Sequence, residues 1–259
     1  MNVTTINGIQ LAYRDEGQGT PLVLIHAFPL SHAMWEPQIA DLSSNLRLIV
    51  PDLRGFGASE LGEIPTSMEQ YADDIGALLD SLGIARVALA GLSMGGYVAF
   101  AFLRKYRARV TALILADTRS GPDSDEGKML REQNARMVEN QGLKPLAEQM
   151  IPKLLAPNAS TSLQNHVRQL IENNNDRGIA AALRAMATRP DSMPLLATID
   201  VPTVVVVGTK DPLTPPSEAY TMSAKIPNSR LIEIADAAHL TNMEDPTAFN
   251  EGLRFVLPA

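Results

Sequence analysis

Ser93 is the residue of this chain whose surroundings most directly suggest chemistry. It is the centre of Gly91-Leu-Ser-Met-Gly95, a G-x-S-x-G pattern that joins an apolar strand-like run to an apolar helix-like run over 94–106. Small residues on both sides of a serine allow the sharp strand-to-helix turn of a nucleophile elbow, which lifts the hydroxyl above the end of a sheet. The alternative is an ordinary tight turn whose serine only caps the following helix.

A serine hydroxyl becomes a useful nucleophile only when a nearby base accepts its proton. Of the four histidines of the chain, His239 follows the run that we predict to be the last strand, 229–234. A histidine on that loop can reach across the edge of the sheet to the serine, so we predict that His239 is the base. Its other interpretation is a surface or capping histidine. His26 follows an early strand, and we expect it to hold its own loop by hydrogen bonds.

Two aspartates are candidates for the acid that orients this histidine. Asp211 follows an unbroken β-branched run, and Asp117 follows the apolar run 110–116. Both runs are typical of buried parallel strands, so either aspartate would lie at the carboxyl edge of the sheet. The order Ser93, Asp211, His239 fits that of serine hydrolases built on an α/β sheet. We favour Asp211 because, if Asp117 were the acid, Asp211 would have no role beside the histidine loop. Asp117 remains the alternative.

Acyl transfer also requires donors for a negatively charged oxygen. We predict that the backbone N–H of Met94, at the start of the helix, supplies one of them. The second donor is expected from the loop after the strand near 21–26, and Phe28 is our candidate there. Because Met94 adjoins Ser93, we also expect its side chain at the site.

These segments together resemble those of α/β-hydrolase-fold esterases. The shared motifs are His26-Ala-Phe-Pro29, Asp52-Leu-Arg-Gly-Phe-Gly-Ala-Ser59, Gly91-Leu-Ser-Met-Gly-Gly96, Asp211 and His239, in this order. Within that family the chain is most similar to small carboxylesterases and 3-oxoadipate enol-lactonases. Serine at position 93 argues against the dehalogenases and epoxide hydrolases of this fold, which use an aspartate there. The chain departs from the family pattern at Ala27, where glycine is usual and tolerates more backbone torsions.

The rest of the chain predicts the scaffold that positions these residues. Strands alternate with helices from the third strand onward, which predicts an α/β fold with an eight-stranded, mostly parallel sheet flanked by helices. This is the α/β-hydrolase fold that the resemblance implies. The predicted strands are 2–6, 9–14, 21–26, 46–51, 86–90, 110–116, 202–208 and 229–234, and the predicted core helices are 34–43, 67–82, 94–106, 217–225 and 246–255.

Residues 119–197 are too many for a plain connection between the sixth and seventh strands. They predict a helical cap, inserted into a core that consists of residues 1–118 and 198–259. The expected cap helices are 125–140, 143–154, 160–174 and 178–188. Over 119–190, Lys and Arg exceed Asp and Glu by two. Cations such as Arg119 or Arg136 would suit a substrate carboxylate, and a solvated face of mixed charge is the alternative.

Composition excludes several functional classes. With 259 residues, 45% of them hydrophobic, the chain can bury one large core, and it has no cysteine for a disulfide, a thiolate nucleophile or a metal. We expect no metal and no cofactor, because neither a metal-ligand spacing nor a glycine-rich nucleotide motif occurs. The net charge of −7 disfavours nucleic acid. No signal sequence or apolar run of about eighteen residues is found, so we expect a cytoplasmic protein without a membrane partner.

The hypothesis is a cofactor-independent serine hydrolase that cleaves a small carboxylic ester through an acyl-enzyme. One alternative is an enol-lactonase of aromatic catabolism. Another, from a different class, is a ligand receptor or regulator that keeps the triad but hydrolyses slowly. Turnover separates the receptor from the enzymes, and the sequence leaves the oligomeric state open.

Overall fold

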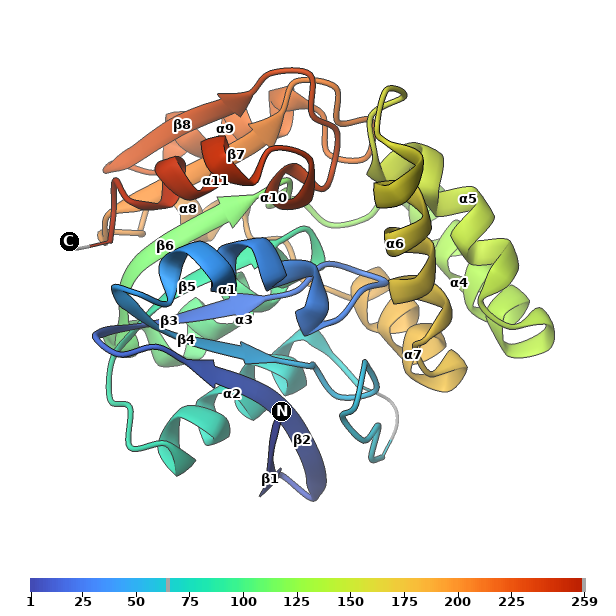
Figure 1. The fold of residues 1–259 in the computed structure, drawn as a ribbon, viewed down its shortest axis with the longest axis horizontal. Coiled ribbons are helices and arrows are strands. Elements are labelled where there is room, and N and C mark those ends of the chain that lie inside the picture. The colour runs from blue at the N-terminus through green and yellow to red at the C-terminus, as the bar shows by residue number, and fades with distance from the viewer. Residues whose placement is uncertain (64–65, 258–259) are drawn as a thin grey trace.

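The computed structural model describes residues 1–63 and 66–257. A central eight-stranded sheet is covered by helices on both faces (Figure 1). The strands are β1 (Asn2–Ile6), β2 (Ile9–Glu16), β3 (Thr20–Ile25), β4 (Leu46–Pro51), β5 (Val87–Leu92), β6 (Val110–Ala116), β7 (Thr203–Gly208) and β8 (Ser229–Ile234). The helices are α1 (Glu36–Leu42), α2 (Met68–Ser81), α3 (Met94–Tyr106), α4 (Asp125–Gln141), α5 (Lys144–Leu154), α6 (Thr161–Glu172), α7 (Asp176–Ala187), α8 (Met193–Leu196), α9 (Pro216–Lys225), α10 (Thr241–Glu244) and α11 (Pro246–Leu253).

The strands lie in the order β1-β2-β4-β3-β5-β6-β7-β8. β1 and β2 form an antiparallel hairpin whose turn residues, Asn7 and Gly8, both have positive φ, as the favoured two-residue hairpin turn requires. β2 is also antiparallel to β4, and all the later pairs are parallel. The carboxyl ends of β5, β6, β7 and β8 therefore meet at one edge of the sheet. The predicted fold class is confirmed.

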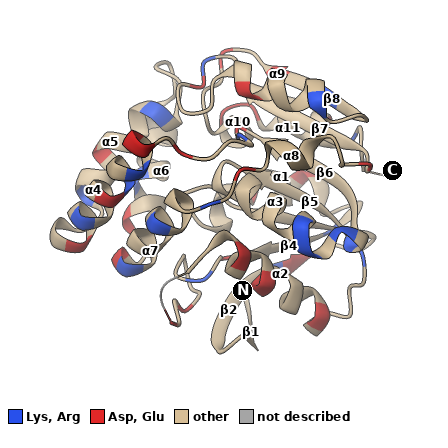
Figure 2. Ribbon diagram, turned by 180° about the vertical axis from the view of Figure 1, so that it is seen from behind, with Lys and Arg blue, Asp and Glu red and all other residues tan. Residues whose placement is uncertain are grey.

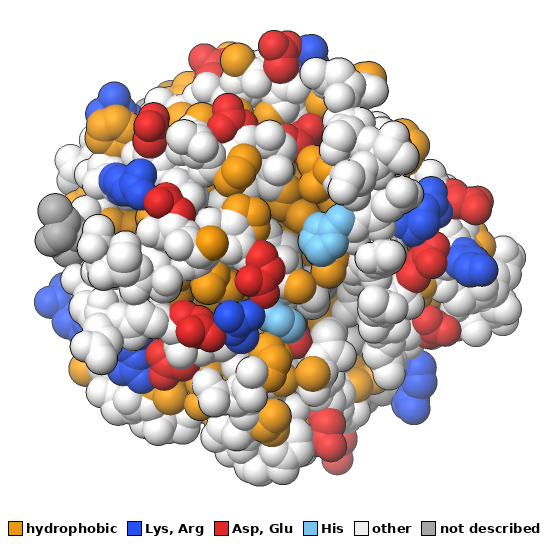
Figure 3. Space-filling model, in the orientation of Figure 1, with side chains coloured by type: hydrophobic (Ala, Val, Ile, Leu, Met, Phe, Trp, Pro, Cys, Tyr) orange, Lys and Arg blue, Asp and Glu red, His pale blue; other side chains and the backbone are white. Residues whose placement is uncertain are grey.

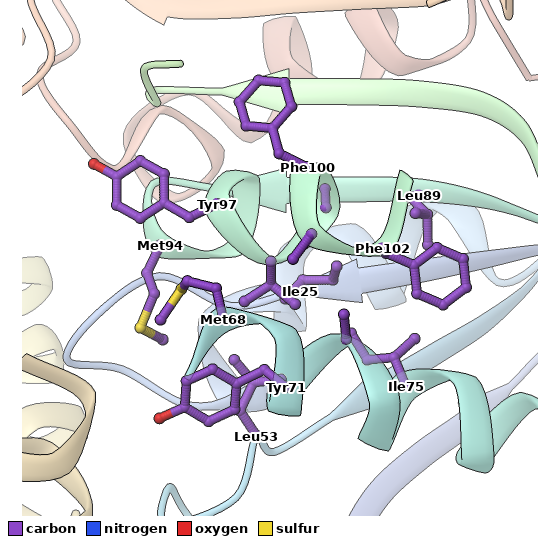
Figure 4. Close-up of a cluster of buried hydrophobic side chains, with 14 of the residues drawn as sticks. Ile25, Leu53, Met68, Tyr71, Ile75, Leu89, Met94, Tyr97, Phe100 and Phe102 are labelled. Carbon is purple, nitrogen blue, oxygen red and sulfur yellow. The ribbon is translucent and has the colours of Figure 1, made fainter. Parts of the chain in front are cut away.

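Each strand sends alternate side chains to opposite faces of the sheet. In β3, Val23 and Ile25 join one buried cluster with α2, α3 and α9, whereas Leu22 and Leu24 join a second with α1 and α11. Figure 4 shows part of the first cluster, where side chains of α2 and α3 interlock above the sheet. Because these two clusters pack the helices against both faces of the sheet, they also hold the edge at which the parallel strands end.

Helices α4 to α8 form the segment between β6 and β7. The four longer ones, α4 to α7, begin and end within two residues of the boundaries predicted for them. The short α8 was not predicted. Helices α4 to α7 lie together to one side of the sheet, in the direction in which the arrows of β6 and β8 point (Figure 1). Their buried residues belong to the same two clusters as the sheet. Their outer faces carry charges of both signs (Figure 2).

Candidate active site

Ser93 lies at the turn between β5 and α3, with φ 56° and ψ −113°. A non-glycine residue with positive φ is uncommon and must be held by its surroundings. Its N–H donates to the carbonyl of Ala116 at the end of β6 (2.9 Å). Its carbonyl accepts the hydroxyl of Thr118 (2.8 Å) and the N–H of Gly96 (2.9 Å). These three bonds keep the side chain above the sheet edge, where it is partly exposed.

The glycines of the elbow are required by close backbone contacts. A Cβ on Gly91 would lie 2.3 Å from the carbonyl oxygen of Gly95, and a Cβ on Gly95 would lie 2.2 Å from that of Ile25. Backbone atoms cannot move aside as a flexible side chain can. The G-x-S-x-G spacing is therefore the condition for α3 to turn back directly over β5 and β3.

Ser93, His239 and Asp211 form one chain of hydrogen bonds. The Oγ of Ser93 is 2.8 Å from Nε2 of His239, and Nδ1 of His239 is 2.7 Å from Oδ2 of Asp211. Both His239 and Asp211 are buried. A carboxylate beside Nδ1 keeps the proton on that nitrogen, which leaves Nε2 free to accept from the serine.

Asp211 is held by the turn that follows β7. Its Oδ1 accepts the N–H groups of Leu213 (2.8 Å) and Thr214 (3.0 Å), and its Oδ2 accepts the hydroxyl of Thr214 (2.5 Å). Burial acts to raise the pKa of Asp211, but the charge of His239 and the hydrogen bonds from His239 and Thr214 outweigh it and hold this pKa below its usual range. Thr214 was missed in the sequence, where its position three residues after an aspartate was the available signal.

Asp117, the alternative acid, lies at the end of β6 and is fully buried. Its carboxylate accepts the N–H of Gly208 (2.9 Å) and the hydroxyl of Thr241. The carboxylate beside Nδ1 of His239 belongs to Asp211. The two aspartates thus have different partners.

The loop after β3 is built around His26. Its Nδ1 donates to the carbonyl of Ala27 (3.0 Å), and its Nε2 accepts the N–H of Leu53 (3.1 Å). Burial lowers the pKa of His26 to about 4, so the ring is neutral near pH 7. Ala27 is not among the non-glycine residues with positive φ, so alanine is accommodated there without that strain.

The predicted donors to a negatively charged oxygen are two backbone amides. Phe28 lies in the His26 loop, and Met94 directly follows Ser93 as the first residue of α3. Within residues 1–63 and 66–257, neither N–H donates to another protein group. The Met94 side chain does not line the site, contrary to our expectation. It is fully buried and points into the cluster between α2 and α3, near Met68 (Figure 4). The helix begins immediately after the elbow, and its first side chain therefore faces the core.

A pocket of about 200 Å³ opens beside Ser93 and His239. Phe28, Tyr97 and Leu213 line it from the core, and the inserted segment contributes the rest of its apolar wall. The apolar residues from that segment are Leu130, Leu146, Met150, Leu183 and Met186. Met150 and Met186 are therefore the methionines of the inserted segment that line this pocket.

Cations exceed anions along this pocket. Its lining includes Arg119, Arg131, Lys153 and one carboxylate, Asp123. That carboxylate is shared by three guanidinium groups, those of Arg119 (3.0 Å), Arg131 and the neighbouring Arg189 (2.8 Å).

Arg136, the other cation considered from the sequence, lies elsewhere. It is exposed and pairs with Glu132 (2.9 Å). Across the described part of the chain, no three His, Asp or Glu side chains are grouped so as to hold a metal ion. No helix in that part is both long and apolar enough to cross a membrane.

Comparison with known proteins places these features in a family. The model of the alpha/beta hydrolase fold family matches residues 20–246. The chain is 30% identical to 3-oxoadipate enol-lactonase 2 of Acinetobacter baylyi, over 98% of this chain and 95% of that protein. Its structure is similar to that of a thermophilic esterase from Thermogutta terrifontis with malate bound (44% identity, TM-score 0.94, 98% and 95% of the two chains). It is also similar to the enol-lactonase from Burkholderia xenovorans (29%, 0.92, 98% and 99%).

Proposed function

Because the chain belongs to the α/β-hydrolase-fold family of hydrolases, we propose that it is a carboxylesterase that cleaves small esters through an acyl-enzyme on Ser93. The observation that carries this proposal is the hydrogen-bonded series from Ser93 through His239 to Asp211. A nucleophile, a base and an orienting acid in this arrangement are what serine acyl transfer needs. The esterase similar to this chain supports the reaction class.

In the first half-reaction, Oγ of Ser93 attacks the ester carbonyl carbon while Nε2 of His239 takes the hydroxyl proton. The carbonyl oxygen becomes negatively charged. When the tetrahedral intermediate collapses, His239 returns the proton to the leaving alcohol. Water then attacks the acyl-enzyme with His239 again as base, and the acid product and free Ser93 are formed. Asp211 stabilises the imidazolium that exists between these proton transfers.

The N–H groups of Phe28 and Met94 are the proposed donors to the negatively charged oxygen. Both lack a protein acceptor among the residues described, which is the condition of a donor reserved for a reacting atom. Met94 is the first residue of α3, so the positive end of the helix dipole also points at this position.

The segment 119–197 is proposed to act as a cap over the core formed by 1–118 and 198–259. Support comes from the pocket, whose wall beyond Ser93 and His239 is made mainly by α4, α5 and α7. A pocket of about 200 Å³ fits a short acyl group. We therefore expect rates to fall as the acyl chain of the substrate lengthens.

A lactone or ester that carries a free carboxylate is the second candidate substrate. The excess of guanidinium groups around Asp123, together with Lys153, favours it, because an anion would find unneutralised positive charge near the nucleophile. The enol-lactonases similar to this chain, and the malate in the similar esterase, support the same class.

A panel of p-nitrophenyl esters of increasing acyl length, with neutral and carboxylate-bearing lactones, tests the proposal. The wild-type protein should hydrolyse short esters, and Ser93→Ala should be inactive but folded. An organophosphate should add once, at Ser93, as measured by intact mass and peptide mapping. Labelling elsewhere, or activity in Ser93→Ala, would contradict the proposed role of Ser93. Only a trace of turnover by the wild type would contradict the esterase and leave the receptor alternative.

A further inference from the structure

Asp117 is a fully buried carboxylate to which the proposed reaction gives no role. It follows β6 directly, with φ 43°. Its N–H donates to the carbonyl of Val206 in the neighbouring strand β7 (2.9 Å). Aspartate enters this left-handed region more readily than most residues, yet a buried carboxylate there still needs strong compensation.

The compensation comes from two groups that lie close in the chain to Asp211 and His239, two members of the proposed triad. Oδ1 of Asp117 accepts the N–H of Gly208, the last residue of β7 and three residues before Asp211. Oδ2 accepts the hydroxyl of Thr241, two residues after His239. One carboxyl group therefore joins the turn that holds the acid to the loop that holds the base.

No positive charge accounts for this burial. Among the described residues, no Lys, Arg or His forms an ion pair with Asp117, whereas Asp211 and Glu244 place negative charge near it. Burial raises the pKa of Asp117 well above its usual range, the charge of Asp211 raises it further, and the two hydrogen bonds oppose this. A group buried at such cost is retained for its contacts.

The His239 loop is also held by contacts to other parts of the molecule. The carbonyl of Ala237 accepts the N–H of Lys210, in the turn after β7 (2.9 Å), and the amide of Asn242 donates to the carbonyl of Met34 (2.8 Å) and to the side chain of Gln38 (3.1 Å). The N–H groups of His239 and Leu240 both donate to the carbonyl of Leu154 in the inserted segment (3.1 Å each). The carboxylate of Glu244 accepts the N–H of Ala238 (2.8 Å) and that of Ala156, again in the inserted segment (2.7 Å). Asp117 thus ties the loop to the end of β6, whereas the other bonds tie it to the turn after β7, to the inserted segment and to residues 34–38.

We infer that Asp117 is a positioning residue, which sets the place of His239 relative to Ser93 by holding Thr241 and Gly208 at the sheet edge. The inference rests on the proposed function. A displacement of about 1 Å in a reacting pair can reduce a rate on the order of a hundredfold. A tie at this point therefore acts on the proton transfer more than on substrate binding.

Thr241→Val tests the tie, because valine keeps the shape of threonine and removes the hydroxyl. We expect kcat on a short p-nitrophenyl ester to fall about ten- to a hundredfold, with KM changed less than about twofold. Thr203→Val is the matched control. Thr203 is a buried threonine at the opposite end of β7, and its hydroxyl bonds the carbonyl of Val201 (3.0 Å). It should lose stability without losing kcat.

Rescue at position 117 adds a second measurement. Asp117→Ala should behave like Thr241→Val, whereas Asp117→Asn offers one oxygen to Gly208 and an amide to the hydroxyl of Thr241, and should recover most of kcat. The rate of organophosphate labelling at Ser93 should follow the same order, because it needs His239 but no substrate pocket. Thermal unfolding establishes that each variant is folded.

The failures of the two proposals can be distinguished. The positioning role is overturned if Thr241→Val leaves kcat and labelling unchanged, or if Asp117→Asn is as slow as Asp117→Ala. In either case Ser93→Ala stays inactive. A wild-type protein without esterase activity, or an active Ser93→Ala variant, refutes the proposed function instead.

Discussion

Ser93 differs from an ordinary turn serine in what surrounds its backbone. Its positive φ is held by bonds to Ala116 at the end of β6, to Thr118 two residues later and to Gly96 in α3. A serine that only capped the helix would turn its side chain toward the free N–H groups, but this side chain makes no cap bond to α3. Its hydroxyl is paired with His239 instead. The backbone at this residue therefore favours a nucleophile over a cap.

Asp211→Asn should reduce kcat by roughly a thousand- to ten-thousandfold, since loss of the proposed triad acid leaves the histidine without its orienting partner. Asp117→Asn should stay within about tenfold of wild type, because the amide preserves the tie described above. Steady-state kinetics of both variants on the same ester make the comparison. If Asp117→Asn were the slower enzyme, the acid would have to be assigned to the end of β6.

His26 should make the fold sensitive to acid. The pKa of His26 is about 4 in the folded protein, compared with 6.5 for a histidine in an unfolded chain. Between pH 4 and 6.5 the unfolded chain therefore binds more protons than the folded one. Stability is therefore lost as the pH falls from about 6.5 to 4, by about 3 kcal/mol from this residue alone.

Urea unfolding of wild type and of His26→Asn between pH 7 and 4 measures this contribution. The variant should be less stable at pH 7, because it disturbs the bonds to Ala27 and Leu53. Its stability should then fall by less on acidification. Equal losses in the two proteins would show that His26 does not remain neutral on folding.

At the scale of elements, the site depends on how closely α3 approaches β3 and β5. Gly95→Ala would place a Cβ 2.2 Å from the carbonyl oxygen of Ile25, next to the His26 loop. We expect it to lower stability by about 1–3 kcal/mol and to reduce kcat by more than tenfold, because helix and loop must separate. Gly121→Ala is the control, since nothing lies within 4 Å of its added Cβ. Thermal unfolding and kinetics should show little change there.

The end of α6 is joined to the loops of the core by Asn174. Its Nδ2 donates to the carbonyl of Pro29 (2.9 Å), and its Oδ1 accepts the N–H of Gly57 (2.8 Å). We expect Asn174→Ala to destabilise the protein by about 1–3 kcal/mol and to lower kcat several-fold, because Pro29 adjoins Phe28. The exposed Asn173, whose side chain makes no hydrogen bond among the described residues, provides Asn173→Ala as control. Equal kinetics of the two variants would separate this bridge from catalysis.

At the scale of the whole molecule, overall and local charge have opposite signs. The chain carries −7, whereas the pocket has more cations than anions. On the face shown in Figure 3, acidic and basic side chains are interspersed without a patch of one sign. An anionic substrate is repelled by the net negative charge of the whole chain and attracted by the cations of the pocket. Which effect is larger depends on which charge dominates near Ser93.

For an ester with a free carboxylate, kcat/KM should fall as ionic strength rises from about 0.01 to 0.15 M, because the screening length shrinks from about 30 to 8 Å. A matched neutral ester should show no such change. Arg119→Gln should reduce the salt dependence and the preference for the anionic ester together. A rate that rose with salt would mean that the net negative charge dominates, and would count against the carboxylate subsite.

Local sequence determined the elements and the order of the chemistry. Strand boundaries at β4, β6 and β8 were confirmed, because β-branched and apolar runs between turn residues fix them without distant contacts. The α8 helix was missed because four residues give no periodic signal, and α10, also four residues long, escaped for the same reason.

Tertiary structure decided the rest. Asp117 and Asp211 follow adjacent parallel strands, and neighbouring strands lie only about 4.8 Å apart, so no local pattern tells which carboxylate faces His239. The direction of the Met94 side chain depended on how α3 packs on α2, and the charge of the pocket on three arginines that share Asp123. Sequence spacing thus determined which residues are at the sheet edge. Their pairing came from contacts between residues far apart in the chain, whose geometry exists only once both cores are packed.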